Sequence, residues 1–201
     1  TFYGSYRGYG IAVDASSNVY ITGVSYVTWQ GDGGTNPLHA HSGYIDIVVL
    51  KLNSAGAYQW HTFYGSSEDY DCGYGIAVDG SGNVYITGES RATWQGDGNT
   101  NPLNAYRGGN DIVALKLTSA GVYQWHTFYG SNDYDYSYGI VVDASGNVYI
   151  TGASNATWGS PLHPHSGYSD IVVVKLNSEG TYQWNTFYGS YRGYGIAVDA
   201  S

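Results

Sequence analysis

The chain has 201 residues, of which 42% are hydrophobic and only 11% are charged, and its net charge is −9 at pH 7. The hydrophobic content excludes a disordered chain, and the negative charge argues against nucleic acid or an anionic membrane as partner, because both would repel it. No run of about 18 apolar residues is present, so no membrane insertion is expected. The 30 glycines and 23 tyrosines indicate many turns between aromatic strands, as in an extracellular all-β protein.

The sequence is a tandem array. Three copies of one pattern cover residues 1–61, 62–126 and 127–185, and residues 186–201 repeat residues 1–16 letter for letter. Repetition at this period is typical of solenoids, propellers and other arrays. The sequence therefore predicts three structural repeats and the start of a fourth.

The first half of each copy predicts a β-hairpin. Bulky residues Tyr9, Ile11 and Val13 alternate with small ones, which is the period of two that a strand requires. Residues 15–18 form a turn-rich loop before a second alternating run at 19–23. The matching loops of copies two and three contain Gly and Asn, which tolerate positive φ.

The second half of each copy predicts two further strands. Residues 46–52 are apolar on both faces, as expected for a strand that is covered on both sides, and residues 58–65 form an aromatic run. Gly56 lies between them, where a hairpin with a bulge needs a left-handed residue, and Gly121 and Gly180 recur at the same place. Four antiparallel strands covered on both faces describe a blade of a β-propeller-like fold.

Two segments also resemble a known family. DIVALKLTSAGVYQWHTFYGS at 111–131 and DYDCGYGIAVDGSGNVYITG at 69–88 are similar to the SBBP, or seven-bladed β-propeller, repeat, and the likeness extends to all copies. The chain departs from the family pattern in its long Trp-containing loop and in Tyr-Gly-Ser where the family usually has Leu-Gly-Gly. The resemblance implies a propeller-type fold in secreted or surface proteins, and it implies no catalytic residues.

Three blades and a fraction are too few to close a ring, because propellers close with about four to eight blades. The outer faces of the first and last blades would then be bare, and large exposed apolar faces mark interaction surfaces. Since 186–201 repeats 1–16, a head-to-tail contact between copies would give a ring or a filament. The chain lacks Met and begins within the pattern, so we also expect that it is a window of a longer polypeptide whose further repeats supply the neighbours.

Three tryptophans are the best ligand-binding candidates. Trp29, Trp94 and Trp158 each follow Thr in the long loop, once per copy. A repeated aromatic plate suits stacking against sugars, and it also suits packing between neighbouring blades. Packing is favoured because the tryptophan persists where the loop of copy three shortens.

Two patterns resemble metal ligands. Asp97, Asn99 and Asn101 alternate as in a calcium loop, but Pro102 stands where such a loop wants Gly, and copy three lacks the segment. Paired histidines could grip a transition metal, but copy two replaces them and no third ligand stands at an obvious spacing. We therefore predict turns and polar loops rather than metal sites; the pairs are His39 with His41, and His163 with His165.

The acidic residues do not form a catalytic constellation. The cluster Glu68, Asp69 and Asp71 has a partial counterpart in copy three at 133–135, but copy one has none. A catalytic centre breaks symmetry, whereas other aspartates and a lysine recur in every copy. They are predicted to cap turns and to form hydrogen bonds between blades: Asp14, Asp79 and Asp143, Asp46, Asp111 and Asp170, with Lys51, Lys116 and Lys175. The lone Cys72 allows no intrachain disulfide, and we read it as a small buried side chain.

These observations predict a non-enzymatic structural or adhesive protein, located outside the cell or at its surface. Its partners would be copies of itself or further repeats of a longer chain, without cofactor or metal. The alternative is a carbohydrate-binding module that uses the loop tryptophans.

Overall fold

The computed structural model describes residues 7–189 and 191–199. Residues 1–6 of the first copy, and residues 190 and 200–201 of the fourth, lie outside the described residues. The chain forms strands of seven or eight residues: β1 Arg7–Val13, β2 Val19–Ser25, β3 Asp46–Leu52, β4 Tyr58–Tyr64, β5 Asp71–Val78, β6 Val84–Ser90, β7 Asp111–Leu117, β8 Tyr123–Tyr129, β9 Asp135–Val142, β10 Val148–Ser154, β11 Asp170–Leu176 and β12 Tyr182–Tyr188.

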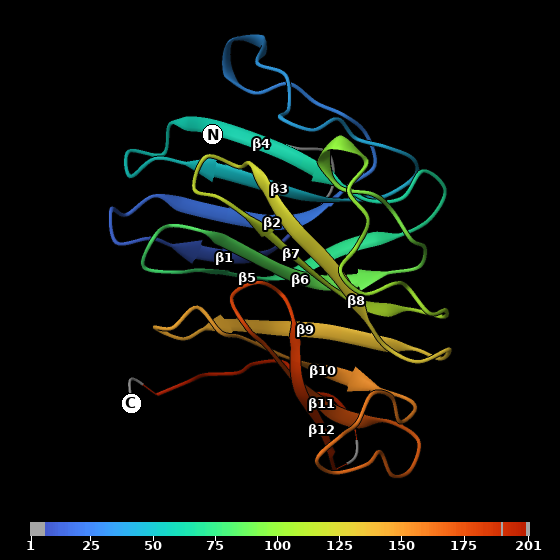
Figure 1. The fold of residues 1–201 in the computed structure, drawn as a ribbon. Coiled ribbons are helices and arrows are strands. Elements are labelled where there is room, and N and C mark those ends of the chain that lie inside the picture. The colour runs from blue at the N-terminus through green and yellow to red at the C-terminus, as the bar shows by residue number, and fades with distance from the viewer. Residues whose placement is uncertain (1–6, 190, 200–201) are drawn as a thin grey trace.

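The strands form three four-stranded antiparallel sheets in which chain neighbours pair: blade 1 (β1–β4), blade 2 (β5–β8) and blade 3 (β9–β12). Figure 1 shows the sheets stacked in chain order. The innermost strands β1, β5 and β9 lie side by side, and β5 also packs on β2 and β3. This is the predicted blade architecture. Blades 1, 2 and 3 each end three residues beyond the sequence copies, at 64, 129 and 188 instead of 61, 126 and 185, because the fourth strand runs through the copy boundary.

Each inner hairpin is closed by an aspartate, as predicted. Asp14 Oδ1 accepts the backbone N–H groups of Ser16 and Asn18, both at 2.9 Å. Asp14 Oδ2 accepts the Asn18 amide and the Tyr20 hydroxyl. The bonds from Asn18 hold the pKa of Asp14 below its ordinary value. The same network recurs at Asp79 and Asp143.

Each outer hairpin contains the predicted bulge. Gly56 has φ +77°, and the β3–β4 register shifts between Lys51 and Leu52. Gly121 and Gly180 both have φ +79° beside the same register shift. A side chain at these left-handed positions would be strained, which explains why only glycine appears there.

The long loop between the second and third strands returns along the outer strand. Leu103 N donates to His126 O at 3.0 Å, and Phe128 N donates to Asn104 O at 3.2 Å. In blades 1 and 2 the loop also contains a short 3-10 helix, Asp32–Gly34 and Asp97–Asn99, which the sequence pattern did not predict. Blade 3 lacks this segment.

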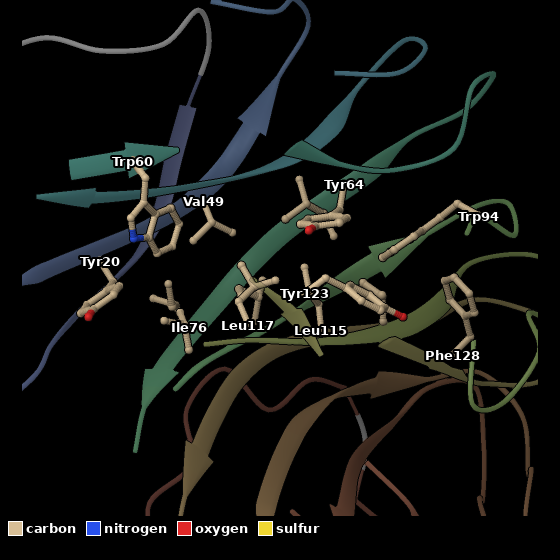
Figure 2. Close-up of a cluster of buried hydrophobic side chains, with 14 residues drawn as sticks. Tyr20, Val49, Trp60, Tyr64, Ile76, Trp94, Leu115, Leu117, Tyr123 and Phe128 are labelled. Atoms are coloured by element: carbon tan, nitrogen blue, oxygen red, sulfur yellow. The ribbon is translucent and has the colours of Figure 1, made fainter. Parts of the chain in front are cut away.

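The core lies between sheets. The cluster in Figure 2 joins Tyr20, Val49 and Trp60 of blade 1 to Ile76 and other side chains of blade 2. A second cluster joins blade 2 to blade 3 through buried residues of both. Blade 2 is therefore covered on both faces, and its stability depends on both neighbours.

Candidate functional site

The inner strands repeat one set of contacts at each boundary between blades. The Asp71 amide of blade 2 donates to the Ile45 carbonyl of blade 1 at 2.9 Å, and the Asp135 amide of blade 3 donates to the Asn110 carbonyl of blade 2 at 2.8 Å. The ring of Tyr74 lies near those of the matching tyrosines on both sides, with centroids 5.1 Å from Tyr9 and 5.8 Å from Tyr138. The two boundaries therefore use equivalent residues in equivalent places.

Glycine allows the inner strands to approach closely. A Cβ at Gly10 would lie 2.8 Å from the Tyr74 carbonyl, and a Cβ at Gly75 would lie 2.9 Å from the Tyr138 carbonyl. Real Cβ atoms are not found this close to backbone atoms. Only glycine fits at these positions without moving the next blade.

The outer strands carry a second repeated contact. Lys51 Nζ and Trp60 Nε1 of blade 1 both donate to the Ser119 carbonyl of blade 2, at 2.8 and 3.2 Å. Lys116 and Trp125 of blade 2 donate in the same way to the Ser178 carbonyl of blade 3, at 3.0 and 3.3 Å. Each blade thus offers a lysine and a tryptophan on one face and a loop carbonyl on the other.

Residues 191–199, the tail, occupy the inner-strand position of a further blade on blade 3. The Tyr191 amide donates to the Ser169 carbonyl at 2.7 Å, which is the bond that Asp71 and Asp135 make at the other boundaries. The Tyr194 ring lies 5.1 Å from that of Tyr138, and the Tyr194 carbonyl is 3.0 Å from the Cβ position of Gly139. The tail therefore repeats the contacts of β5 and β9.

The face of blade 3 that points away from blade 2 is called here the C-terminal face. Where the tail does not cover it, its side chains are more exposed than their counterparts in the other blades. Tyr188 is 57% exposed, whereas its counterpart Tyr64 is 1% exposed beneath blade 2. Other side chains that the neighbour buries in blade 1 are only half-buried here: Ile171, Val173 and Trp184.

The face of blade 1 that points away from blade 2, called here the N-terminal face, is also more exposed than the equivalent faces of blades 2 and 3. Ile11 is 69% exposed, whereas its counterpart Ile76 is 8% exposed against blade 1. The outward residues of its second and third strands are half-buried, whereas their counterparts in blades 2 and 3 are buried: Val19, Ile21, Val48 and Leu50. The side chains exposed on these two faces are equivalent to those that face each other at the boundaries inside the chain.

The loop tryptophans lie in packing positions. The Trp94 indole is 5% exposed and stacks on His126 at a centroid distance of 3.8 Å, and Trp29, which is half-buried, stacks on His61 at 3.7 Å. Trp158 is 7% exposed, and its Nε1 donates to Asp135 at 2.9 Å. A platform for a sugar ring needs an exposed aromatic face, which the buried rings of blades 2 and 3 do not present.

Comparison with known proteins gives one family. A profile of the SBBP beta-propeller repeat family matches residues 59–92 and 124–157, which span the fourth strand of one blade and the first two strands of the next. These two segments of the chain match SBBP beta-propeller repeats. No curated protein matches it significantly. The family resemblance and the all-β propeller-like fold expected from the sequence are thus confirmed.

The fourth strands of blades 1 and 2 contain histidines whose role the sequence did not reveal. The His126 ring accepts the Tyr123 hydroxyl at Nδ1, at 2.7 Å, and donates from Nε2 to the Trp94 carbonyl, at 3.1 Å. Burial lowers the pKa of His126 to about 4, so the ring is neutral. In the third repeat Asn185 makes the same two contacts, to the Tyr182 hydroxyl and the Trp158 carbonyl.

Buried carboxyl groups flank a glycine at each boundary between the blades. A Cβ at Gly65 would lie 2.6 Å from Asp46 Oδ1 and 3.0 Å from Asp71 Oδ2. Burial raises the pKa of both aspartates to about 7. Gly130 is flanked in the same way by Asp111, whose pKa burial raises to about 7, and Asp135.

The recurrent aspartates and lysines divide the two predicted roles between them. Asp46 Oδ2 accepts the Ser42 amide within its own blade, at 2.6 Å, and the lysines rather than the aspartates bind across the boundary. Its other oxygen, Oδ1, is buried without a hydrogen bond among the described residues.

A cleft opens beside each carboxyl pair. Between blades 2 and 3 it has a volume of about 410 Å³, and it is lined by aromatic rings and by Asn104 and Arg107. Between blades 1 and 2 it has a volume of about 620 Å³ and a more polar lining that includes His39 and Asn99. Next in sequence to Gly65, which lines this second cleft, the Tyr64 hydroxyl donates to Asp97 of the 3-10 segment, which blade 3 lacks.

The remaining candidates are engaged in local contacts. His39 Nδ1 bonds the Phe63 carbonyl at 2.8 Å, and His41 Nε2 bonds the Ser25 carbonyl at 3.1 Å. Cys72 is buried, and burial raises its pKa. Across 7–189 and 191–199, no three His, Cys, Asp or Glu side chains group closely enough for a metal ion. The described part of the chain also contains no helix long and apolar enough to cross a membrane.

Proposed function

We propose that this chain is a non-enzymatic structural protein that acts outside the cell or at its surface. In this proposal its blades continue head to tail, and the C-terminal face of one copy packs against the N-terminal face of another. The observation that carries it is the position of the tail, since Tyr191 and Tyr194 repeat on blade 3 the contacts of β5 and β9. That surface is built to receive an inner strand of the sequence found in β1.

The two bare faces support the proposal by their complementarity. On the C-terminal face, Lys175 and Trp184 stand where Lys116 and Trp125 donate to a loop carbonyl of the next blade. On the N-terminal face, Ser54 holds the place of that acceptor loop. A head-to-tail contact would satisfy these donors and bury apolar side chains of both faces.

The number of copies depends on the rotation between neighbouring blades. Two copies of three blades supply six, which lies within the range of about four to eight at which propellers close. A rotation that closes gives a ring, and one that does not gives a filament. A closed dimer would have a mass of about 43 kDa, twice 21.7 kDa.

The absence of a catalytic role is part of the proposal. Its support is that the buried polar groups recur between blades: Asp46 with Asp71, and Asp111 with Asp135, flank equivalent glycines. A centre of catalysis usually breaks such symmetry with one unusual group of side chains. The location outside the cell is supported by composition, because only 11% of the residues are charged.

Light scattering after size-exclusion chromatography, over a hundredfold range of concentration, tests the assembly. We expect a mass above 21.7 kDa that grows with concentration. Trp184→Ala should weaken the association, because its ring lies on the C-terminal face, whereas the exposed neighbour Gln183→Ala should not. A monomer at every concentration would refute the proposal. Antibody labelling of intact source cells tests the location.

A second candidate function, carbohydrate binding, is favoured by the cleft between blades 2 and 3. Its volume of about 410 Å³ suits one or two sugar rings. Of the rings that line it, Tyr182 is half-buried and offers a face for stacking, whereas Tyr129 and Trp158 are buried. Asn104 and the exposed Arg107 provide polar groups at its rim. Arg107 favours a sugar that carries a carboxylate.

A glycan array that includes uronic and sialic acids tests this candidate. Arg107→Ala should remove binding if the cleft is used, while Arg91→Ala, which alters an exposed arginine outside the cleft lining, should keep it. Silence of the array, or equal loss in both variants, would refute carbohydrate binding at this cleft.

A further inference from the structure

Tyr44 and Tyr70 meet across the boundary between blades 1 and 2. Their ring centroids are 5.1 Å apart, with an angle of 81° between the ring planes. Tyr44 is 50% exposed and Tyr70 is half-buried, so the pair lies at the surface. A hydrogen bond joins the two side chains and raises the pKa of Tyr70. The hydroxyl ends of both rings, and the ring carbons beside them, therefore lie next to each other.

The backbone and a neighbouring arginine fix the position of this pair. Ile45, which follows Tyr44, forms a parallel bridge with Tyr70. The Asp71 amide donates to the Ile45 carbonyl at 2.9 Å, which ties the same two segments together. The Arg91 guanidinium lies 4.5 Å from the centroid of the Tyr70 ring. The two tyrosines are thus in contact in the folded chain without any movement of the blades.

We propose that Tyr44 and Tyr70 are a site of oxidative cross-linking, at which a haem peroxidase and hydrogen peroxide join blade 1 to blade 2 through a dityrosine bond. The enzyme takes one electron and one proton from each phenol. The two radicals form a carbon–carbon bond between ring carbons next to the hydroxyls, and each of these carbons passes its hydrogen to the phenol oxygen. The peroxide takes up both electrons and both protons and becomes two molecules of water. This inference goes beyond the proposed function and does not depend on contacts between copies.

The composition of the chain suits such a link. It has 23 tyrosines, no methionine and one cysteine, Cys72, which is buried. Methionine and exposed cysteine are common sites of oxidation, and neither is available here to consume the oxidant. A single cysteine also allows no disulfide within the chain. Coupled tyrosines can therefore supply the covalent link between blades that a disulfide cannot.

A second pair of tyrosines crosses the same boundary but is placed less well for coupling. The rings of Tyr9 and Tyr74 are also 5.1 Å apart. The Tyr74 hydroxyl, however, donates to Glu89 of its own blade at 3.1 Å. This hydrogen bond directs the reactive end of the Tyr74 ring towards the carboxylate, so we expect the link at the other pair.

The other copies provide a natural comparison for Tyr44. In copy two Gly109 stands in its place, so the boundary between blades 2 and 3 lacks the pair. In copy three the counterpart is Tyr168, which is 87% exposed, whereas Tyr44 packs on the rings of both Tyr26 and Tyr70. Tyr168 therefore tests whether exposure alone, without the packing partner, is enough for coupling.

The first experiment treats the dilute protein with a haem peroxidase and hydrogen peroxide. We expect a product that runs as a monomer on a denaturing gel, shows the blue fluorescence of dityrosine and has lost two hydrogen atoms by mass spectrometry. Fragmentation of its peptides should place the link between Tyr44 and Tyr70. Tyr44→Phe should remove the link, whereas Tyr168→Phe, the same change at the equivalent position of copy three, should keep it. Thermal unfolding of the untreated variants checks that both keep the fold.

The second experiment measures the effect of the link on stability. A bond between Tyr44 and Tyr70 closes a loop of the unfolded chain, which restricts the unfolded state as a disulfide does. The linked protein should therefore unfold at a temperature that is higher by on the order of 10 °C than that of the untreated protein. Treated Tyr44→Phe should show no such rise. An unchanged unfolding temperature of the linked protein would show that the bond does not secure the boundary between the blades, and the inference would be wrong.

The position of the link decides the remaining outcomes. The inference is also wrong if treatment gives no dityrosine, if the only products join separate chains, or if Tyr44 is linked to Tyr26 of its own blade. A monomeric product that survives in Tyr44→Phe would assign the coupling to another pair and would contradict the inference equally. None of these results bears on the head-to-tail contact, which light scattering tests separately.

Discussion

The Trp125 indole of blade 2 donates its Nε1 hydrogen to the Ser178 carbonyl of blade 3, at 3.3 Å. Trp60 makes the same bond to Ser119 one blade earlier, at 3.2 Å. Each acceptor lies in the bulged turn of the next blade's outer hairpin. One hydrogen bond thus couples the outer strand of a blade to the turn of its neighbour, and the same indole packs on a tyrosine of its own blade.

This relationship predicts a difference between two equivalent tryptophans. Trp125→Ala removes a buried indole and leaves a cavity, so it should lower the free energy of unfolding by about 3 to 5 kcal/mol. Trp184→Ala removes a half-buried indole from the C-terminal face and should cost about 1 kcal/mol. Urea unfolding of the monomer, followed by circular dichroism, measures both. Equal losses in the free energy of unfolding would show that packing against the next blade does not add to the stabilising effect of Trp125.

A second prediction concerns the neutral histidine beneath Trp94. His126→Asn should be close to neutral at pH 7, because Asn185 already makes the same pair of contacts in blade 3. His126→Ala should cost about 2 to 3 kcal/mol, because it leaves the Tyr123 hydroxyl and the Trp94 carbonyl without their partner.

The effect of His126→Asn on stability should depend on pH. The folded pKa of His126, about 4, lies below the ordinary value of 6.5, so the folded state binds fewer protons than the unfolded state between these values. Its stabilising effect is therefore present above pH 6.5 and is lost as the pH falls towards 4. His126→Asn should unfold at a higher temperature than the natural sequence at pH 5. A pH-independent difference between the two proteins would contradict the assignment of a neutral ring.

Local pattern was enough to predict the blades. The alternation of Tyr9, Ile11 and Val13, the capping by Asp14 and the left-handed Gly56 each depend on interactions within a few residues, so the sequence reports them directly. Coverage of blade 2 on both faces followed from the apolar run that forms β7.

Contacts between distant residues could not be predicted in the same way. The stacking of Trp94 on His126 joins residues 32 apart, and nothing in the pattern of either segment indicates that they meet. The docking of the tail on blade 3 depends on the geometry of β10 and β11. The sequence did contain one indication of the role of this histidine. Copy three has Asn185 where the other copies have histidine, which suggests a neutral side chain that forms hydrogen bonds.

A third prediction compares two glycines of blade 2. Gly75→Ala would place a Cβ 2.9 Å from the Tyr138 carbonyl of blade 3 and should destabilise the protein by about 1 to 3 kcal/mol. Gly80→Ala lies in an exposed turn with open space around the added atom, and its effect should be within about 0.5 kcal/mol. Thermal unfolding of the two variants gives the comparison. A mild effect at Gly75 would mean that the inner strands are less closely packed than described.

The last prediction concerns the carboxyl pair at Gly130. Burial raises the pKa of Asp111 to about 7, so the folded state holds a proton that the unfolded chain releases above its ordinary value near 4. The stability that depends on this group is therefore complete below pH 4 and is lost as the pH rises through 7. Asp111→Asn keeps the oxygen that accepts the Arg107 amide, at 2.7 Å, and removes the titrating group.

We therefore expect Asp111→Asn to match the natural sequence near pH 4 and to exceed its free energy of unfolding at pH 8. The rise in the pKa of Asp111 from near 4 to about 7 corresponds to about 4 kcal/mol of stability. Solvent in the adjoining cleft reduces this to on the order of 2 kcal/mol. Asp79→Asn is the matched control, because the pKa of that turn aspartate is lowered and its substitution should destabilise the protein at neutral pH. Urea unfolding at pH 4, 6 and 8 measures both. A difference for Asp111→Asn that does not grow with pH would show that its carboxyl is ionised in the folded protein.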